Sequence, residues 1–302
     1  MTRDVCVIVN PASGRGLGAR TLPAVGDAFA RVGVTDVRVS ETQYGEKTLA
    51  RRAIEEGKST LVAVGGDGTW SNVANTILES GADVRLGLVA AGTGNDFYKT
   101  VGAPARDLSA TARLVADGTE VRVDVGRIEH KYFLNVAGFG FDIAVLEDIR
   151  EIGWLRGRAL YFYSALRQLL GYRGVDIGIG SHRARRDARH LMLIVANARH
   201  FGGSFRIAPQ ASLVDGLLDA ISIHDAPAMR RMQLFSAAMR GTHVAHPEVV
   251  AEQAERFHLT FAAPPAYETD GEYNVAASSE LDVFCVPRRL RIAALGERAA
   301  LQ

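Results

Sequence analysis

The sequence predicts an α/β N-terminal domain with a parallel sheet, followed by a mainly antiparallel β-sandwich C-terminal domain with a few helices. Over roughly the first 120 residues, continuous apolar runs alternate with helix-like stretches, which is the pattern of βαβ units. Beyond this point, short strand-like segments follow one another with few helical interruptions, as in an antiparallel sandwich. The length of 302 residues also favours about two domains.

In the first half of the chain, each expected strand is a short apolar run, and helix-like stretches separate the runs. Residues that are apolar at every position, as in Val5–Val9, indicate a strand buried on both faces. The expected strands are Val5–Val9, Val37–Val39, Leu61–Val64 and Leu86–Val89, and the expected helices are Leu22–Arg31, Glu46–Glu56, Asn72–Leu78 and Leu108–Val115.

The pattern changes near Val121–Val125, where apolar and polar residues alternate with the period of two that a half-buried strand has. We therefore expect residues 1–122 to form the α/β domain, residues 123–287 the sandwich domain, and residues 288–302 a segment that returns to the domain junction. The further expected strands are Tyr132–Val136, Val175–Ile179, Leu191–Ala196, Leu218–Ile223, Phe257–Phe261 and Leu281–Val286, with helices at Ile143–Ile152, Ala159–Leu170 and Ala228–Met239.

Composition and charge exclude several classes of protein. Lys and Arg number 35 against 34 Asp and Glu, a formal charge of +1, whereas a dedicated nucleic-acid binder normally has a clear basic excess. The two cysteines, Cys6 and Cys285, cannot form a disulfide framework. No apolar run approaches the roughly 20 residues of a membrane-spanning helix, and no signal peptide is visible. We expect a cytoplasmic protein that binds no nucleic acid.

Three glycine-rich polar loops follow three of the predicted strands. They are Asn10–Gly16, Gly65–Thr69 and Gly92–Asp96. Each loop by itself is also compatible with a structural turn, but the carboxyl ends of parallel strands meet at one edge of a sheet, where such folds bind ligands. Backbone N–H groups in glycine loops and at helix N-termini bind phosphate oxygens. The loops therefore predict a nucleotide or phosphate site that matches neither a Walker A loop nor a G-x-G-x-x-G fingerprint.

The three loops together resemble the catalytic domain family of diacylglycerol kinases, which includes sphingosine and ceramide kinases. The family patterns N-P-x-S-G, G-G-D-G-T and G-T-x-N-D-F are present at Asn10–Gly14, Gly65–Thr69 and Gly92–Phe97. Later stretches of the family are matched at Asn135–Asp142, Pro209–Asp219 and Thr269–Glu272, so the resemblance extends over nearly the whole chain.

The resemblance implies ATP as co-substrate and assigns roles residue by residue. It implies nucleotide contacts from Asn10, Ser13, Thr42, Gly65, Gly66, Asp67, Gly68, Thr69, Thr93 and Gly94. Asp67, Asp96 and Asp124 would position the catalytic Mg²⁺, and Asp270 or Glu272 would be the base that accepts the proton of the lipid hydroxyl. Phosphoryl transfer needs neutralised phosphates, an aligned nucleophile and one proton acceptor. Without the resemblance, Asp270-Gly271-Glu272 would be interpreted as a hairpin turn.

Two segments depart from the family pattern. Ser212, Asp215 and Leu217 match a structural Mg²⁺ site, but Val214 stands where relatives often carry a second acid, and a β-turn is the alternative. After Gly-Gly-Asp-Gly-Thr, many relatives continue L-N-E-V, whereas this chain has Trp70–Val73 with Asn72 in place of the Glu. The second departure removes one expected metal or ribose contact.

Two basic segments suggest peripheral contact with a membrane surface that carries the lipid substrate. Trp154–Tyr172 combines aromatic residues with Arg156, Arg158 and Arg167, and a domain-packing helix is the alternative that the sequence alone favours slightly. A second basic cluster, which a solvated loop would also explain, consists of Arg183, Arg185, Arg186 and Arg189. A homodimer is compatible with the sequence.

The resulting prediction is an ATP- and Mg²⁺-dependent lipid kinase that phosphorylates a lipid hydroxyl, with diacylglycerol as acceptor and phosphatidic acid as product. Residues 1–122 would bind the nucleotide and residues 123–287 the lipid. Kinases of sphingoid bases or ceramide share these motifs and are the alternative. An NAD kinase, whose family also carries G-G-D-G-T, and a non-catalytic nucleotide- or lipid-binding regulator are more remote alternatives.

Overall fold

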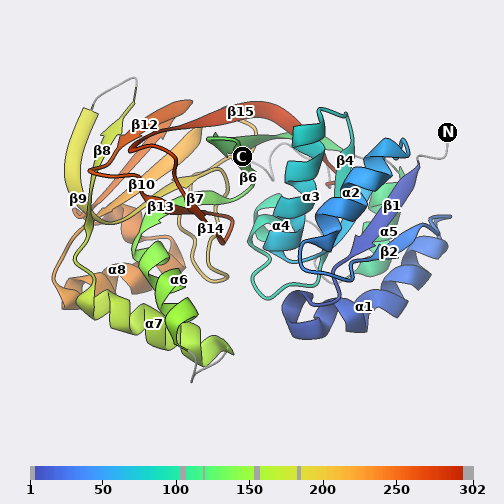
Figure 1. Ribbon diagram of the computed structural model, residues 1–302, viewed down its shortest axis with the longest axis horizontal. Coiled ribbons are helices and arrows are strands. Elements are labelled where there is room, and N and C mark those ends of the chain that lie inside the picture. The colour runs from blue at the N-terminus through green and yellow to red at the C-terminus, as the bar shows by residue number, and fades with distance from the viewer. Residues whose placement is uncertain (1–3, 103–106, 118–119, 153–156, 182–184, 295–302) are drawn as a thin grey trace. The chain divides into compact units, whose positions relative to one another are not determined.

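The computed structural model describes residues 4–102, 107–117, 120–152, 157–181 and 185–294 of the chain (Figure 1). The described residues form two compact units. The first unit contains the chain up to Val125, the short segment Ser212–Gly216, and the chain from Val286 onward. The second unit contains Gly126–Ala211 and Leu217–Cys285.

The first unit contains a parallel sheet. Its strands β1 (Val5–Val9), β2 (Val37–Val39), β3 (Thr60–Gly65) and β4 (Arg85–Ala90) lie in the order β4-β3-β1-β2. The end of β15 (Glu280–Ile292) extends the sheet, because Arg291 and Ile292 pair in parallel with the start of β4. β1 and β3 are buried along their whole length, as their continuous apolar runs predict.

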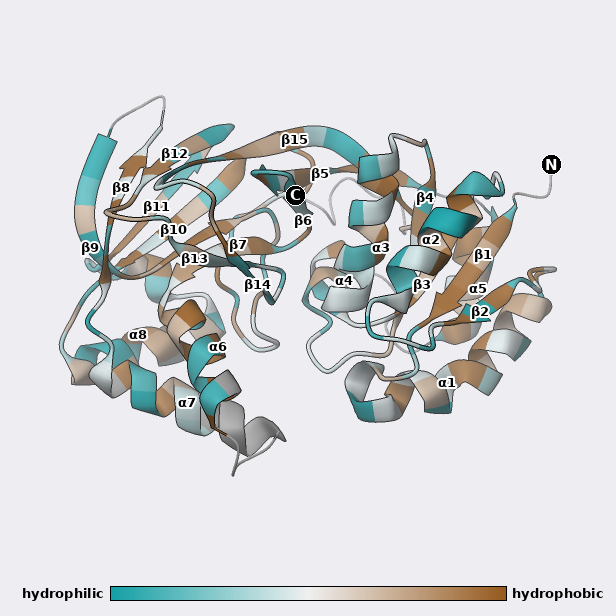
Figure 2. Cartoon of the chain, in the orientation of Figure 1, coloured by the Kyte–Doolittle hydropathy of each residue, from teal (hydrophilic) through white to brown (hydrophobic). Residues whose placement is uncertain are grey.

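Helices cover this sheet and connect its strands. They are α1 (Ser13–Ala30), α2 (Gly45–Glu55), α3 (Asp67–Ser80), α4 (Asp96–Val101) and α5 (Leu108–Asp117). α1 and α5 cover the face on which Val7, Val62 and Val89 lie, and they contribute Phe29 and Val115 to that core. α2 and α3 pack against each other. In Figure 2, β1 of this sheet is largely hydrophobic, while α2 and α3 contain hydrophilic segments.

The second unit is built from antiparallel strands. β7 (Val136–Gly140), β9 (Arg185–Ala196), β8 (Val175–Gly180), β12 (Arg256–Thr260) and the start of β15 pair in this order. β13 (Ala266–Thr269) and β14 (Glu272–Val275) form a hairpin beside β7, and β10 (Leu218–His224) pairs with β9 and β11 (Val249–Ala254). β6 (Lys131–Phe133) pairs with the end of β5 (Val121–Ile128). The predicted fold class is confirmed.

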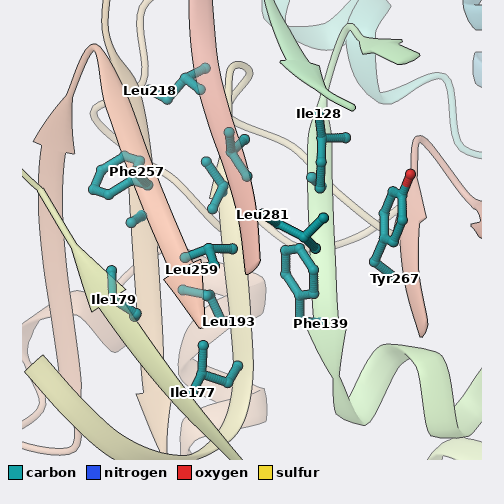
Figure 3. Packing of buried hydrophobic residues seen from close by; sticks show 14 of the residues in the cluster. Ile128, Phe139, Ile177, Ile179, Leu193, Leu218, Phe257, Leu259, Tyr267 and Leu281 are labelled. Atoms are coloured by element: carbon teal, nitrogen blue, oxygen red, sulfur yellow. The ribbon is translucent and has the colours of Figure 1, made fainter. Parts of the chain in front are cut away.

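Alternation along the strands gives the second unit two cores. On β9, Leu193 and Val195 belong to the first core, which is built from strand residues and includes Phe139, Phe257 and Leu281 (Figure 3). The intervening Ile194 and Ala196 face a second core, made with α6 (Phe141–Glu151), α7 (Gly157–Gly171) and α8 (Ala228–Arg240). A short 3₁₀ helix, His243–Ala245, follows α8.

Two strands, β5 and β15, begin in one unit and end in the other. The expected boundary after residue 122 falls inside β5, and the segment Ser212–Gly216 returns to the first unit from within the stretch expected to be continuous sandwich. Of the expected C-terminal segment 288–302, the part up to Ile292 is the end of β15, and residues 295–302 lie outside the described residues. Cys6 and Cys285 are both free thiols.

Candidate functional site

The first unit contains a cavity of about 550 Å³ at the carboxyl ends of its strands. Seven of the expected nucleotide ligands line it: Asn10, Ser13, Thr42, Gly66, Gly68, Thr69 and Thr93. Gly65, Asp67 and Gly94 are expected ligands that belong to the same loops but are not part of the lining. Glu46 and Asn72, which were not among the expected ligands, also line the cavity. The three glycine-rich loops therefore meet at one site, as the strand pattern predicts.

The loops approach each other so closely that side chains would not fit between them. A Cβ atom on Gly92 would collide with the Cα of Gly66, and a Cβ atom on Gly14 would collide with the carbonyl oxygen of Ala91. Gly14 also has a positive φ of 55°, which favours glycine. The backbone itself therefore forms this wall of the cavity.

Hydrogen bonds hold the polar side chains of the loops in place. The side-chain amide of Asn10 donates to the Thr69 hydroxyl at 3.1 Å, and the Ser13 hydroxyl donates to the Asn10 carbonyl at 2.9 Å. α3 begins directly at Asp67, and its N-cap Gly66 offers no side-chain cap. The first N–H groups of this 14-residue helix therefore lack a capping side chain, which suits a phosphate ligand.

Asp67 and Asp96 lie together at the start of α3 and α4. Asp67 accepts a hydrogen bond through Oδ1 from the N–H of Phe97, 3.0 Å away, and the nearly buried Asp96 pairs with Lys99 at 2.8 Å. Within the described ranges, no three His, Cys, Asp or Glu side chains form a metal cluster. Mg²⁺ in kinase sites is commonly held by one or two carboxylates together with the substrate phosphates. The donor set of these two aspartates, beside a helix start that suits a phosphate ligand, therefore fits Mg²⁺.

Asp124, the third acid expected at the catalytic metal, is fully buried and hydrogen-bonded to the backbone. Its Oδ2 accepts from the N–H of Gly216 and its Oδ1 from the N–H of Arg288, both at 2.7 Å. Its own N–H donates to the carbonyl of Leu213 at 2.7 Å. The structure thus brings Asp124 to the Ser212–Gly216 segment and to β15, where it joins three separate stretches of the first unit.

The residues expected at the structural Mg²⁺ site lie in and beside this segment. The Ser212 hydroxyl accepts a hydrogen bond from the N–H of Val214 at 3.3 Å, and Asp215 is exposed. Leu217 is the first residue of the stretch that returns to the second unit. The segment is a turn, and its one carboxylate faces solvent.

The two candidate bases, Asp270 and Glu272, lie at the β13–β14 hairpin of the second unit. Asp270 and Gly271 both have positive φ, 51° and 87°, and form the turn. The Asp270 carboxylate accepts three backbone hydrogen bonds, from Leu134 and Asn135 at 2.8 Å and from Val136 at 3.1 Å. Glu272 is partly exposed and pairs with the Lys131 ammonium at 3.2 Å. Asp270-Gly271-Glu272 therefore forms a hairpin turn and also contains the two acids that are the candidate bases.

A buried pair of carboxyl groups, one of them on β13 of this hairpin, was missed by sequence reasoning. Glu268 is paired across the sheet with Gly138, and a Cβ on Gly138 would collide with Asp142 Oδ2 and lie 3.0 Å from Glu268 Oε1. Burial raises the pKa of Asp142 to about 7, and backbone N–H groups at the start of α6 offset this only in part. Burial and the charges of Asp142 and Asp270 raise the pKa of Glu268 well above its ordinary value. The N-x-x-G-x-G-x-D stretch contains Asp142 but gives no signal that it has an acidic neighbour.

The segments expected at a membrane are described only in part. Trp154, Arg156 and Arg183, and the side chain of Arg158, lie outside the described residues. Arg167 on α7 pairs with the buried Asp148 at 2.7 Å, and Arg185 and Arg189 pair weakly with aspartates at 3.5 and 3.8 Å. None of the helices that the structure describes combines the length and the apolar character required to cross a membrane.

Comparison with known proteins supports the fold independently. The family pattern described as diacylglycerol kinase catalytic domain matches residues 4–128, and the pattern described as YegS C-terminal NAD kinase beta sandwich-like domain matches residues 135–294. The fold resembles that of a diacylglycerol kinase crystal structure from Bacillus anthracis, with a TM-score of 0.74 at 17% identity over 97% of both chains. A further structure from that organism gives a TM-score of 0.79 at 18% identity over 97% of this chain and 95% of the other.

Sequence relatives extend over nearly the full chain. A diacylglycerol kinase of Mycobacterium tuberculosis is 30% identical over 298 residues, which cover 95% of this chain and 94% of the relative. A diacylglycerol kinase of Staphylococcus haemolyticus is 29% identical over 275 residues, or 90% of this chain and 83% of the relative. With both family patterns matched in order and a relative at this identity spanning both chains, the chain belongs to the diacylglycerol kinase family of lipid kinases.

Proposed function

We propose that this kinase transfers the γ-phosphate of Mg²⁺-bound ATP to the free hydroxyl of diacylglycerol and releases phosphatidic acid and ADP. The observation that carries the proposal is the cavity at the strand ends of the first unit, where three glycine-rich loops meet through their backbones. The names of the relatives support the choice of diacylglycerol as acceptor. Fold alone does not choose an acceptor, so the substrate is the part of the proposal that needs a direct test.

The loops would bind the phosphates of ATP. The N–H groups at the start of α3, from Gly66 to Thr69, and the hydroxyl of Thr93 are the proposed triphosphate ligands, and Asn10 and Ser13 order the adjoining loop. Asp67 and Asp96 would hold Mg²⁺, which supplies neutralisation of the charge on the β- and γ-phosphates. Lys99 beside Asp96 adds one further positive charge close to this position.

Glu272 is the proposed base. In the transfer step, the lipid hydroxyl gives its proton to the Glu272 carboxylate while its oxygen forms a bond to the γ-phosphorus, and the bond from that phosphorus to the bridging oxygen of ADP breaks. Asp270 is the proposed positioning residue, because its carboxylate already accepts three backbone N–H groups that stabilise the anion. Lys131 holds the Glu272 side chain through their ion pair.

Asp124 and the Ser212–Asp215 turn are proposed to stabilise the first unit. The two backbone hydrogen bonds to Asp124 occupy both of its carboxylate oxygens. Binding of a second Mg²⁺ at Asp215 would add oxygen ligands from carbonyl groups of the turn, including those of Ser212 and Leu217. This second metal would order the turn and takes no part in the chemical step.

A membrane contact would bring the kinase to its substrate. α7 exposes Tyr163 and Leu166, and α8 exposes Met229, Met232 and Met239, of which Met229 is 70% exposed. The two helices pack together, since Arg231 of α8 donates to the carbonyl of Leu169 on α7 at 2.9 Å. An exposed set of large apolar side chains on adjoining helices is suited to the interface of a bilayer. Peripheral binding of these helices to lipid is therefore part of the proposal.

The proposal is tested by transfer of label from [γ-³²P]ATP to lipids in mixed micelles with Mg²⁺. The panel contains diacylglycerol, monoacylglycerol, sphingosine and ceramide, with NAD as a water-soluble acceptor. Labelled phosphatidic acid that is lost in Glu272→Gln supports the proposal. If only sphingosine, ceramide or NAD becomes labelled, that molecule is the acceptor in place of diacylglycerol. If ATP binds but no acceptor becomes labelled, catalysis by this chain is refuted.

A further inference from the structure

Glu46 is a buried acid in the wall of the cavity and has no role so far. It lies in the first turn of α2 and is only 3% exposed. Its Oε1 accepts a hydrogen bond from the side-chain amide of Asn72 at 2.7 Å. Its Oε2 is buried and has no hydrogen-bond partner among the residues that the structure describes. Asn72, on α3, lines the same cavity.

A buried carboxylate oxygen without a donor is unfavourable, because the desolvation of the charge is not compensated. The cost disappears when a ligand that enters the cavity offers a hydrogen-bond donor to Oε2. A phosphate cannot be this group, since it carries negative charge and would be repelled. The part of the ligand next to Glu46 must therefore carry N–H or O–H groups.

The order of the strands indicates which part of a nucleotide this is. The loops after β3 and β4 provide the helix starts that suit phosphates, and the sheet order is β4-β3-β1-β2. Glu46 and Thr42 belong to the segment that follows β2, at the other end of this series. A nucleotide with its phosphates on the β3 and β4 loops would extend toward β2 with its nucleoside part.

From this placement we infer that Glu46 accepts a hydrogen bond from the nucleoside part of ATP and selects for it, with Asn72 as the residue that positions the carboxylate. The donors available are the 6-amino group of adenine and the hydroxyls of ribose. This inference rests on the proposed function, because it assumes that the cavity binds ATP. Guanine and hypoxanthine carry an oxygen acceptor at the 6-position and would meet the Glu46 carboxylate unfavourably.

The test compares the binding of four nucleotides to the wild-type protein and to Glu46→Gln by calorimetry, without lipid. The nucleotides are ATP, ITP with its 6-oxo group, 2′-deoxy-ATP and 3′-deoxy-ATP. Gln is isosteric, its carbonyl oxygen can still accept from Asn72, and its amide presents a donor in place of the free oxygen. Glu55→Gln, an exposed acid near the other end of α2, is the matched control. Thermal melts of each variant check that it is folded.

Loss of a charge-assisted hydrogen bond predicts roughly 10- to 100-fold weaker ATP binding in Glu46→Gln and no change in Glu55→Gln. If the donor is the 6-amino group, ITP binds the wild type at least about 10-fold more weakly than ATP, and Glu46→Gln reduces or reverses this penalty. If the donor is a ribose hydroxyl, one of the deoxy analogues shows the penalty in the wild type, and the variant removes it. Either pattern supports the inference and identifies the donor.

Two results would overturn the inference in different ways. Equal ATP affinity for wild type and a folded Glu46→Gln variant, with every analogue penalised alike in both proteins, would show that Glu46 does not contact the nucleoside. Absence of any ATP or ADP binding to the wild-type protein would refute the proposed nucleotide site itself, and with it this inference.

Discussion

Replacing Asp142 with Asn should change how the stability of the second unit depends on pH. The ordinary pKa of an aspartate is 3.8, whereas burial raises that of Asp142 to about 7 in the folded chain. Between these values the folded chain binds one more proton than the unfolded chain. The free energy of unfolding therefore falls as pH rises through this window, and the contribution of this group levels off once the pH exceeds the folded pKa.

The size of the effect follows from the shift. Each pH unit inside the window costs about 1.4 kcal/mol for one proton, so Asp142 alone removes about 3 kcal/mol of stability between pH 5 and pH 8. The pKa of Glu268 is raised in the same direction, in part by the charge of Asp142, so the loss in the wild type is at least this large. Asn carries no ionisable group and relieves Glu268 of that charge. Relative to the wild type, Asp142→Asn should gain about 3 kcal/mol over the same pH range.

The assay is urea unfolding at pH 5, 6, 7 and 8 followed by far-UV circular dichroism. Hydrogen exchange of peptides from β7 and β9 assigns the transition to the second unit. Any loss of stability from the substitution that does not depend on pH cancels, because the prediction concerns the difference in the free energy of unfolding between two pH values. Glu255→Gln, which changes an exposed acid of the same unit, is the control. Parallel stability curves for the wild type and Asp142→Asn would refute the argument that this carboxyl is buried and protonated in the fold.

Four further outcomes are expected. Gly92→Ala should weaken ATP binding by about 5- to 150-fold in calorimetry, because overpacking costs about 1–3 kcal/mol where the new Cβ meets the Gly66 backbone. Glu272→Gln should lower kcat about 10²- to 10⁴-fold with unchanged ATP affinity, as loss of a general base does. Asp124→Ala should lower the free energy of unfolding by about 3 kcal/mol or more in urea titrations, since two charge-assisted hydrogen bonds of about 1.5–3 kcal/mol each are removed. Met239→Glu on α8 should reduce cosedimentation with diacylglycerol-containing vesicles while leaving activity on a water-soluble short-chain diacylglycerol intact.

Much of the fold could be predicted because its signals are local. The buried strands β1 and β3 consist of continuous apolar residues, and their positions were predicted to within one residue at each end. The helix expected from Asn72 in fact begins at Asp67, because the loop residues Gly-Thr also form its first turn. The edge strands β11 and β14 were not predicted. In Val249–Ala254 the apolar and polar residues come in blocks and do not alternate, and Glu272–Val275 has only four residues.

The part of the candidate site that consists of backbone could be predicted from the sequence. Glycine loops after strands indicate where N–H groups gather, and the structure brings these loops together as expected. The side chains that meet across the fold carry no comparable signal. Glu46 and Asn72 are 26 positions apart and meet only because α2 packs on α3. Asp142, in the first turn of α6, meets Glu268 because α6 follows β7 directly and β7 pairs with β13.

The surroundings of each acidic side chain, more than its residue type, separate a structural role from a chemical one. Asp270 accepts three backbone N–H groups, so protonation would break hydrogen bonds that the fold requires. Glu272, two residues further along the hairpin, is partly exposed and pairs with the ammonium group of Lys131, a flexible side chain that can move aside as the proton is taken up. The motif contains both acids at fixed spacing, and a sequence cannot tell them apart. Asp270→Asn should therefore lower stability together with activity, whereas Glu272→Gln should lower kcat in a protein that unfolds at the wild-type urea concentration, and the reverse pattern would exchange their roles.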